Sequence, residues 1–308
     1  MKMSMHRILA TLVAFAATTL PAFAFEPKPG DIGFQDAATP NMVRLHDFHD
    51  HLLLYITAGI VVMVFALLAW VALRYNAKTN PVPSKTSHNV LIEVIWTIIP
   101  ILILIGIAVP SYKLLFYLDR TAEPDMTLKA TGSQWYWTYT YPDHEDLEIE
   151  ARMIPENEMD EFIPDGKGRR MLETYNPVVV PIEKNIQVIT TATDVIHAWT
   201  IPAFGAKKDA VPGRTNETWF RVTVPGIYYG QCSEICGKDH AAMPISVYAV
   251  TQGEYDNWIS CVSKDEASAD YPSRACVRKL GLDKYRDKQK GHAVTSAKNE
   301  TTTGAADE

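Results

Sequence analysis

Two long apolar stretches dominate the first third of the chain. Residues 52–73 carry no charged side chain, and residues 90–112 carry only Glu93. At about 1.5 Å per residue, the first stretch spans roughly 33 Å, enough to cross a hydrocarbon core of about 30 Å. Neither stretch has the polar stripe of a soluble amphipathic helix. The pattern predicts a transmembrane helical hairpin over residues 52–118, with helices at about 52–73 and 90–115.

A shorter apolar stretch, residues 8–20, precedes the hairpin. It follows Lys2 and Arg7 and ends in Pro21-Ala22-Phe23-Ala24, where small residues flank an aromatic one. This arrangement is typical of a secretory signal peptide. We expect residues 1–24 to be cleaved and residues 25–51 to form a periplasmic N-terminal segment.

The loop between the two long stretches carries Arg74, Lys78 and Lys85 and no acidic residue. The positive-inside rule places such a loop in the cytoplasm. Both ends of the mature chain are therefore expected in the periplasm, and the protein in the inner membrane of a bacterium.

Beyond residue 119 the pattern changes to short alternating segments broken by proline and glycine. Such a pattern predicts an all-β domain, a sandwich or Greek-key barrel, over residues 119–260. A closing helix is expected at residues 251–260, with Thr251 as N-cap and Glu254 as its capping-box partner. Strands are expected at residues 127–130, 134–141, 178–181, 186–191, 219–224, 226–229 and 245–250.

Residues 261–308 differ in composition and are expected to form a C-terminal extension. Cys261 and Cys276 bracket a polar segment, and in an oxidising compartment a disulfide is the default expectation for them. From about Asp283 onward the chain is polar and is expected to be disordered.

The formal net charge is −7, from 36 acidic and 29 basic residues. Acidic residues are concentrated in residues 143–183, which hold twelve carboxylates against four cations. This segment is either a solvated face or a field that steers a basic protein partner. The chain lacks a Cys-x-x-Cys-His motif, which excludes an attached c-type haem.

Cys232, Cys236, His240 and Met243 follow one another at spacings of four, four and three. A disulfide is the usual state of an exported cysteine pair, but it does not explain the nearby histidine and methionine. Thiolate, imidazole and thioether together favour copper over harder cations. The cluster therefore predicts a copper site.

A single blue-copper ion takes two histidines, one cysteine and a weak methionine. His197, 35 residues upstream and expected at the end of an apolar strand, can supply the second histidine, which leaves one cysteine surplus. Two bridging thiolates hold two copper ions, each completed by one histidine and one weak ligand. Met243 supplies one weak ligand and the carbonyl of Glu234 the other, so we predict a dinuclear copper centre.

With these ligands, the chain resembles subunit II of the haem-copper cytochrome c oxidases over roughly residues 25–260. The resemblance implies a cupredoxin-like Greek-key domain whose CuA centre accepts electrons from cytochrome c. It also implies electron transfer to haem in subunit I, where O2 is reduced to water with proton pumping, and a subunit III partner. Quinol-oxidising relatives lack the CuA motif.

The aromatic segment Gln134-Trp-Tyr-Trp137 gains a role from the resemblance. If the strand is regular, alternation places Trp135, Trp137, Tyr139 and Tyr141 on one face. Packing over the β domain accounts for most of these side chains. The resemblance implies that Trp135 is an exposed contact that accepts the electron from cytochrome c.

The resemblance also implies acidic docking positions for cytochrome c. Glu145, Asp146 and Asp194 match positions of that kind. Thr140 and Tyr175 stand where many relatives carry a carboxylate, so the docking surface is expected to be arranged differently here.

Two further acids have implied roles. The carboxylate of Glu234 matches a ligand of a Mg²⁺ or Mn²⁺ ion shared with subunit I. Glu93 lies about one turn into the second apolar stretch and can snorkel to the cytoplasmic headgroups, but intramembrane acids are functional candidates. The resemblance places Glu93 at the mouth of a proton-uptake channel.

Two other classes of protein fit the sequence less well. A copper-delivery protein needs fewer and more exposed ligands that release the metal, whereas six ligands retain it. A copper-free subunit of a quinol oxidase is disfavoured by the complete ligand set.

Overall fold

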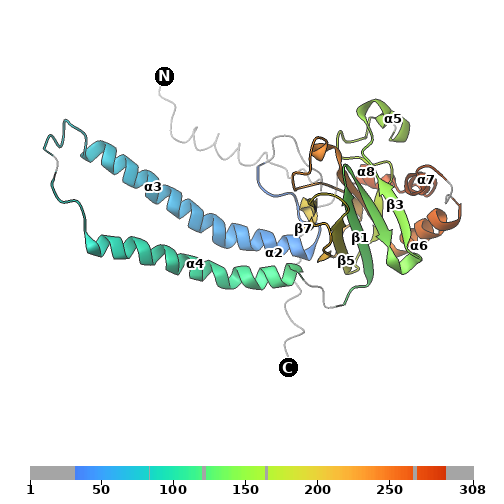
Figure 1. Ribbon diagram of the computed structural model, residues 1–308, viewed down its shortest axis with the longest axis horizontal. Helices are drawn as coiled ribbons and strands as arrows, with labels where there is room; N and C mark the ends of the chain where they lie inside the picture. The colour runs from blue at the N-terminus through green and yellow to red at the C-terminus, as the bar shows by residue number, and fades with distance from the viewer. Residues whose placement is uncertain (1–31, 83, 120–122, 164–165, 266–268, 289–308) are drawn as a thin grey trace, which may run out of the picture.

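The computed structural model describes residues 32–82, 84–119, 123–163, 166–265 and 269–288. A long helical hairpin leads into a β domain (Figure 1). This confirms the architecture predicted from the two apolar stretches and the alternating segments after them. The expected signal peptide, residues 1–24, lies outside the described residues.

The hairpin helices are longer than the apolar stretches. The first runs without a break through α2 (Pro40–Phe48), a π-helical turn (His49–Leu53) and α3 (Leu54–Arg74). The second is α4 (Val90–Asp119). Both are long and apolar enough to cross a membrane, and their apolar side chains are exposed. The extra turns at the domain end hold polar residues that contact the β domain.

The β domain is fixed to the hairpin at β8 (Asn216–Phe220). The indole N–H of Trp219 donates to the carbonyl of Tyr117 at 2.8 Å, and Thr218 donates to Leu118 at 3.3 Å. The amide of Asn41 in α2 donates to the carbonyl of Trp219 at 2.7 Å. Both hairpin helices, α2 and α4, are therefore hydrogen-bonded to β8.

Three sheets form the β domain. The largest has the order β3-β2-β1-β5-β8, with β1 and β5 parallel and the other neighbours antiparallel. The second has the order β4-β10-β9 with β4 parallel to β10, and β6 pairs with β7. The other strands are β1 (Met126–Ser133), β2 (Tyr136–Tyr141), β3 (Leu147–Ala151), β4 (Val178–Pro181), β5 (Ile186–Ala192), β6 (His197–Ile201), β7 (Ala206–Ala210), β9 (Gly226–Gln231) and β10 (Pro244–Val250). Short helical turns lie at Pro142–His144, Glu156–Glu158, α5 (Met159–Phe162), Pro202–Phe204 and His240–Ala242.

The seven predicted strands are present, β4 with the predicted ends and the other six with shifted ends, and three further strands were not predicted. β3 and β7 are rich in charged residues, so their apolar alternation is weak. The prediction for residues 134–141 was wrong at its start, because β2 begins at Tyr136. Trp137, Tyr139 and Tyr141 are fully buried on one face, whereas Trp135 precedes the strand and is only partly buried.

The closing helix α6 (Gln252–Ser260) has the predicted capping box. Thr251 caps the helix, and the Glu254 carboxylate accepts from the backbone N–H of Thr251 at 3.0 Å. Glu254 also pairs with Lys284 and accepts from the hydroxyl of Tyr285 at 2.6 Å. One carboxylate therefore joins α6 to the C-terminal extension.

This arrangement predicts a pH dependence of stability. Burial opposes the ionised form of Glu254, but bonds from Lys284, Tyr285 and Thr251 outweigh it and lower the pKa from 4.5 to about 2. Because the folded pKa lies below the unfolded one, the stabilisation is present above about pH 4.5 and lost as pH falls toward 2. Thermal unfolding of Glu254→Gln and of the unmodified chain should differ near neutral pH and converge in acid. A difference that does not shrink below about pH 4 contradicts this assignment.

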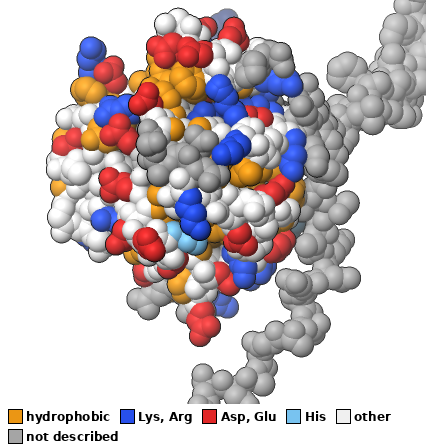
Figure 2. All heavy atoms as spheres, turned by 90° about the vertical axis from the view of Figure 1, so that its right-hand side faces the viewer, with side chains coloured by type: hydrophobic (Ala, Val, Ile, Leu, Met, Phe, Trp, Pro, Cys, Tyr) orange, Lys and Arg blue, Asp and Glu red, His pale blue; other side chains and the backbone are white. Residues whose placement is uncertain are grey.

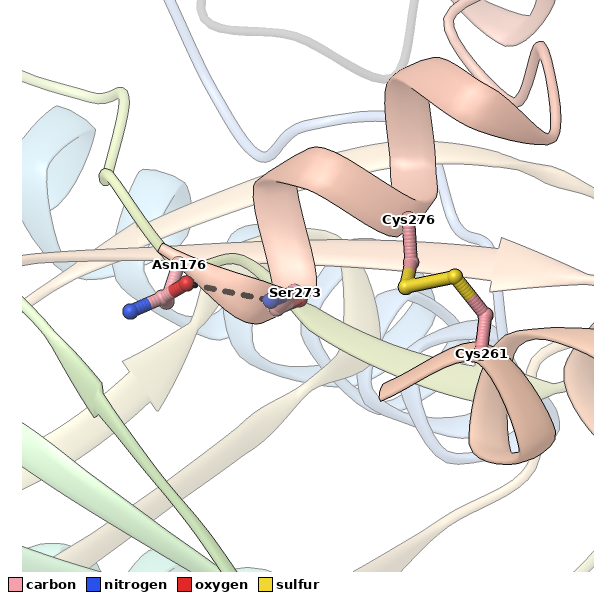
Figure 3. Close-up of a disulfide and its surroundings, with 4 residues drawn as sticks. All are labelled: Asn176, Cys261, Ser273 and Cys276. Carbon is pink, nitrogen blue, oxygen red and sulfur yellow. Dashed lines mark hydrogen bonds between the residues drawn. A yellow bond between two sulfur atoms is a disulfide. The ribbon is translucent and has the colours of Figure 1, made fainter. Parts of the chain in front are cut away.

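The C-terminal extension is folded onto the domain. It contains a π-helical turn (Cys261–Asp265), α7 (Pro272–Lys279) and α8 (Lys284–Lys288). The expected Cys261–Cys276 disulfide is confirmed, and Figure 3 shows it beside the bond from Ser273 N–H to the Asn176 side chain, 3.2 Å long. We call residues 269–288 the C-terminal clasp.

The expected disorder from Asp283 was therefore wrong for residues 283–288, and the boundary at 260 does not separate two units. Cys261, Val277, Leu282 and Tyr285 belong to the same buried core as the strands. Every residue of β4 and β10 is buried, because α6 and the clasp cover the face of that sheet that an open sandwich would leave to solvent. Residues 289–308 lie outside the described part of the chain.

The clasp is held by a buried ionic cluster. Glu173 is fully buried, and both of its oxygens accept from the guanidinium of Arg286, one at 2.9 Å. Its Oε1 also accepts from the hydroxyl of Tyr229 at 2.6 Å. Arg274, 1% exposed, donates to the hydroxyl of Tyr248 at 2.9 Å. Tyr229 and Tyr248 belong to β9 and β10, so the cluster joins the clasp to the strands on either side of residues 232–243.

Candidate metal centre

Residues 232–243 form a loop between β9 and β10, here called the copper loop. Its base is closed by a bond from the Cys232 N–H to the carbonyl of Met243, 3.4 Å long. A second bond, from the N–H of Ser233 to the carbonyl of Ala198 at 3.0 Å, ties the loop to β6. His197 is the first residue of β6, so the prediction that this histidine lies at the end of a strand was wrong. The pairing nevertheless brings His197 to the loop.

All six predicted donor groups come together at this loop. The two sulfurs of Cys232 and Cys236 lie 4.0 Å apart. The Cys232 sulfur lies 3.8 Å from His197 Nδ1 and 3.4 Å from the Glu234 carbonyl oxygen. The Cys236 sulfur lies 3.4 Å from His240 Nδ1 and 3.6 Å from the Met243 sulfur.

These separations fit bound metal. An ion held at about 2.0 Å by nitrogen and 2.3 Å by sulfur in tetrahedral surroundings keeps neighbouring donor atoms roughly 3.5–3.8 Å apart. Each sulfur has one histidine nitrogen and one weaker donor at such a distance, which is the donor set of two ions sharing two thiolates. Cys232, Cys236 and His197 are buried, so water has little access to the donor atoms. Soft sulfur and nitrogen donors favour copper.

His197 is oriented by its neighbours. Its Nε2 lies 2.9 Å from the carboxylate of Asp194, which leaves Nδ1 directed at Cys232 as a ligand atom. Gly132 of β1 makes room for the ring, because a Cβ at that position would lie 2.8 Å from the imidazole. Burial opposes ionisation of Asp194, but bonds from His197 and from two backbone N–H groups hold the pKa of Asp194 below its usual value. A charged Asp194 thus fixes the tautomer of His197.

The two thiols differ in acidity. Burial opposes ionisation of Cys232, but the bond with His197 and those with nearby backbone groups lower the pKa of this thiol to about 7. Burial and the adjacent Cys232 sulfur raise the pKa of Cys236 to about 12. Because both thiols must be deprotonated as ligands, metal binding is coupled to proton release, chiefly from Cys236.

Trp135 lies beside the copper loop. A Cβ on Gly237 would come within 3.0 Å of its indole, so the ring contacts the backbone next to Cys236. Gln134, which immediately precedes it, donates its side-chain amide to the carbonyl of Cys236 at 2.7 Å. Gln134, Gly132 and Gly237 were not predicted as site residues, because each acts through a contact with a segment far away in the sequence, which no spacing rule marks.

The predicted acidic docking residues do not form one cluster. Glu145 and Asp146 are exposed at the turn between β2 and β3, at the end of β2 far from the copper loop. At about 3.3 Å per residue, this turn lies roughly 20 Å from Trp135. Asp194 is adjacent to the loop, but its oxygens accept from His197, Gln134 and Val195. The hydrogen bonds of Asp194 therefore lie within the metal centre.

The remaining predicted residues lie apart from the donor set. The side chain of Glu234 is exposed on the copper loop, and Glu93 lies in the first turn of α4. Within the described ranges, His197, Cys232 and Cys236 are the only set of three or more His, Cys, Asp or Glu residues grouped closely enough for a metal ion.

Comparisons with known proteins agree with this geometry. Residues 126–250 match the family described as "Cytochrome C oxidase subunit II, periplasmic domain", and residues 27–114 match the corresponding transmembrane domain. The probable cytochrome c oxidase subunit 2 of Rickettsia bellii is 47% identical over 260 residues, covering 84% of this chain and 94% of that protein. Cytochrome c oxidase subunit 2 of Drosophila subobscura is 46% identical over 232 residues, covering 75% and 96%.

A solved structure is also similar. The periplasmic domain of subunit II of cytochrome oxidase (CoxB) of Bradyrhizobium japonicum shares 46% identity, with a TM-score of 0.43, covering 47% of this chain and 99% of that one. The two family matches together take in the helical hairpin and all ten strands of the β domain. The chain belongs to the cytochrome c oxidase subunit II family.

Proposed function

We propose that this electron-accepting subunit of a haem-copper oxidase takes electrons from cytochrome c at a dinuclear copper centre in the copper loop. The ligands are His197, Cys232, Cys236, His240, Met243 and the carbonyl of Glu234. The observation that carries the proposal is the presence of two thiol sulfurs 4.0 Å apart, each with its own histidine and weak donor. A single blue-copper ion takes only one cysteine, so a mononuclear site does not account for the second.

The residues of this chain divide the work of the centre. When bound, the copper pair supplies a one-electron site whose geometry changes little on reduction. Asp194 holds His197 in the ligating tautomer, and burial of both cysteines keeps water from the sulfurs. The copper loop is held at its base by strand pairing, so the donors are preorganised before metal arrives.

Copper titration of the purified chain in detergent tests the proposal. Metal analysis should find two coppers bound per chain, and reduced cytochrome c should reduce the loaded chain in a stopped-flow experiment. Binding of one copper, or no reduction by cytochrome c, contradicts it.

We propose that cytochrome c docks over Trp135 and along the outer face of β2 and β3. Figure 2 shows the face of the domain turned away from the hairpin, where acidic and basic side chains are interspersed rather than segregated. Ion pairs such as Glu156–Arg170 balance part of the acidic segment. Thr140 pairs in register with Glu148, which is exposed, so the carboxylate that Thr140 lacks is supplied by the adjacent strand. Glu148 thus joins Glu145 and Asp146 on this surface.

Trp135→Ala should slow electron transfer from cytochrome c and leave the copper spectrum unchanged. The indole contacts the copper loop on one side and is partly exposed on the other, so it bridges the loop and a docked partner. Stopped-flow reduction by cytochrome c measures the rate, and the optical spectrum of the loaded chain measures the centre. A normal rate in this variant removes the role of Trp135.

Two acids are proposed to act with subunit I, and a subunit III partner is expected beside it. The exposed carboxylate of Glu234 offers a hard oxygen ligand to Mg²⁺ or Mn²⁺, with the other ligands supplied by subunit I. Glu93, the one acid in the first turn of α4, is proposed at the mouth of a proton-uptake channel. The cationic loop after α3 supports a cytoplasmic position for this end of the hairpin, with both termini in the periplasm.

A further inference from the structure

Trp135 is held against the copper loop by contacts that involve two residues outside the ligand set. We propose that Gln134 and Gly237 are positioning residues that press the indole of Trp135 onto the loop backbone next to Cys236. An electron accepted at Trp135 then reaches the loop through this contact. The inference rests on the electron-accepting function proposed above.

Gln134 makes hydrogen bonds to two segments of the metal centre, one that carries His197 and one that carries Cys236. Its backbone N–H donates to Oδ2 of Asp194 at 2.7 Å, and Asp194 in turn holds His197. Its side-chain amide donates to the carbonyl of Cys236 at 2.7 Å. These two bonds fix the residue before Trp135 relative to the loops that carry both ligands. A side chain without an N–H donor at position 134 keeps only the first bond.

Gly237 permits the close approach of the indole. Its φ is +127°, a conformation that other residues rarely adopt. A Cβ at this position would lie 3.0 Å from Cζ2 and 3.3 Å from Nε1 of Trp135, and 3.1 Å from Nε2 of Gln134. The edge of the indole therefore lies close against Gly237, the residue that follows Cys236.

The indole N–H of Trp135 supports a role for this contact. Nε1 is buried and has no hydrogen-bond partner among the described residues, although unpaired buried donors are disfavoured. The ring is thus not placed where its polar group is best satisfied. It lies where its edge contacts the copper loop while part of the side chain stays open to solvent.

The contact with Gly237 is also the most direct of three links between Trp135 and the ligands. One of the others runs through the side chain of Gln134 and its hydrogen bond of 2.7 Å to the carbonyl of Cys236. Through Gln134 and Asp194, the link to His197 passes over two hydrogen bonds, of 2.7 and 2.9 Å. Through Gly237 it needs one van der Waals contact and one peptide bond to reach Cys236. The loop backbone is therefore the path that Gln134 and Gly237 maintain.

Gln134→Met and Gly237→Ala test the inference in the copper-loaded chain. Methionine matches glutamine in length and carries neither donor nor charge, and alanine adds the Cβ that meets the indole. The rate of electron transfer from saturating cytochrome c should fall several-fold, because electron tunnelling weakens as the gap between the indole and the loop backbone widens. The apparent KM for cytochrome c and the copper spectrum should stay unchanged. A general loss of structure would alter both.

A second readout needs no copper. The fluorescence of Trp135 is obtained as the difference between the chain and its Trp135→Phe variant, and its quenching by acrylamide reports exposure of the indole. Quenching should increase in Gln134→Met. If Gly237→Ala disturbs the copper spectrum, Gln134→Met alone decides the test.

The outcomes separate the inference from the function on which it rests. If Trp135→Ala slows electron transfer but Gln134→Met leaves both the transfer rate and the quenching normal, the positioning role is overturned. Electron acceptance by Trp135 then still stands. A normal rate in Trp135→Ala overturns that acceptance itself. Slow transfer and increased quenching in Gln134→Met, with KM and spectrum unchanged, establish the positioning role.

Discussion

Cys236→Ser is expected to abolish the dinuclear centre and reduce electron transfer from cytochrome c to the level of the copper-free chain. The Cys236 sulfur is the donor closest to both His240 and Met243, at 3.4 and 3.6 Å. A serine hydroxyl is a hard donor that stays protonated near neutral pH, so it does not replace a bridging thiolate. Copper content should fall from two ions per chain to one or none, as measured by metal analysis.

The second cysteine pair supplies a matched control. Replacing Cys261 and Cys276 together by serine removes the disulfide of the C-terminal extension and leaves the copper loop unchanged. This variant should still bind two coppers. If Cys236→Ser also retains two coppers, the assignment of Cys236 as a bridging ligand is wrong.

Glu173→Gln is expected to lower the free energy of unfolding by about 3–5 kcal/mol, the usual cost of removing one partner of a buried ion pair. Glu173 is fully buried and accepts from Arg286 through both oxygens and from Tyr229. Without its charge, the guanidinium groups of Arg286 and Arg274 stay buried, and Asp283 is the one acid among the described residues that still pairs with them. Denaturant unfolding of the full chain in detergent, followed by tryptophan fluorescence, measures the change.

A surface pair gives the comparison. Glu156 and Arg170 form an ion pair with an N–O distance of 3.1 Å, but their side chains are 75% and 68% exposed. Glu156→Gln should therefore cost less than about 1 kcal/mol. The double variant Glu173→Gln/Arg286→Met should recover part of the loss, since it no longer leaves one charge unpaired. Equal effects of Glu173→Gln and Glu156→Gln would show that the clasp does not depend on the buried cluster.

The copper ligands could be predicted from sequence because four side-chain ligands lie within twelve residues, and ligand chemistry restricts which metals such a set can hold. His197 could be predicted because a second histidine is needed and an apolar strand commonly supplies it. Its immediate neighbours could not, because Asp194, Gly132 and Gln134 act through contacts between segments that only strand pairing brings together.

The C-terminal clasp was missed for a different reason. Its residues are polar, and charged side chains such as Arg274, Arg286 and Asp283 normally indicate solvent exposure. Here Arg274 and Arg286 pair with both Glu173 and Asp283, so a polar segment packs into the domain. The unbroken apolar strands β4 and β10 did carry a signal, since strands without alternation are covered on both faces. That signal predicts a covering layer, but not which segment supplies it.

The acidic residues of segment 143–183 also have different structural roles. Glu173 belongs to the core and Glu156 to a surface ion pair, while Glu145 and Asp146 are exposed at the β2–β3 turn. Composition alone therefore overstated the charge available to a partner. Among the exposed carboxylates that remain, Glu148 lies on β3 and Glu145 and Asp146 lie in the turn before it, and we propose that cytochrome c docks there.

The electron paramagnetic resonance spectrum of the copper-loaded chain tests the central claim most directly. One unpaired electron shared equally by two copper nuclei gives a seven-line hyperfine pattern, which is the result expected for a centre bridged by Cys232 and Cys236. A four-line pattern from a single copper ion would contradict it.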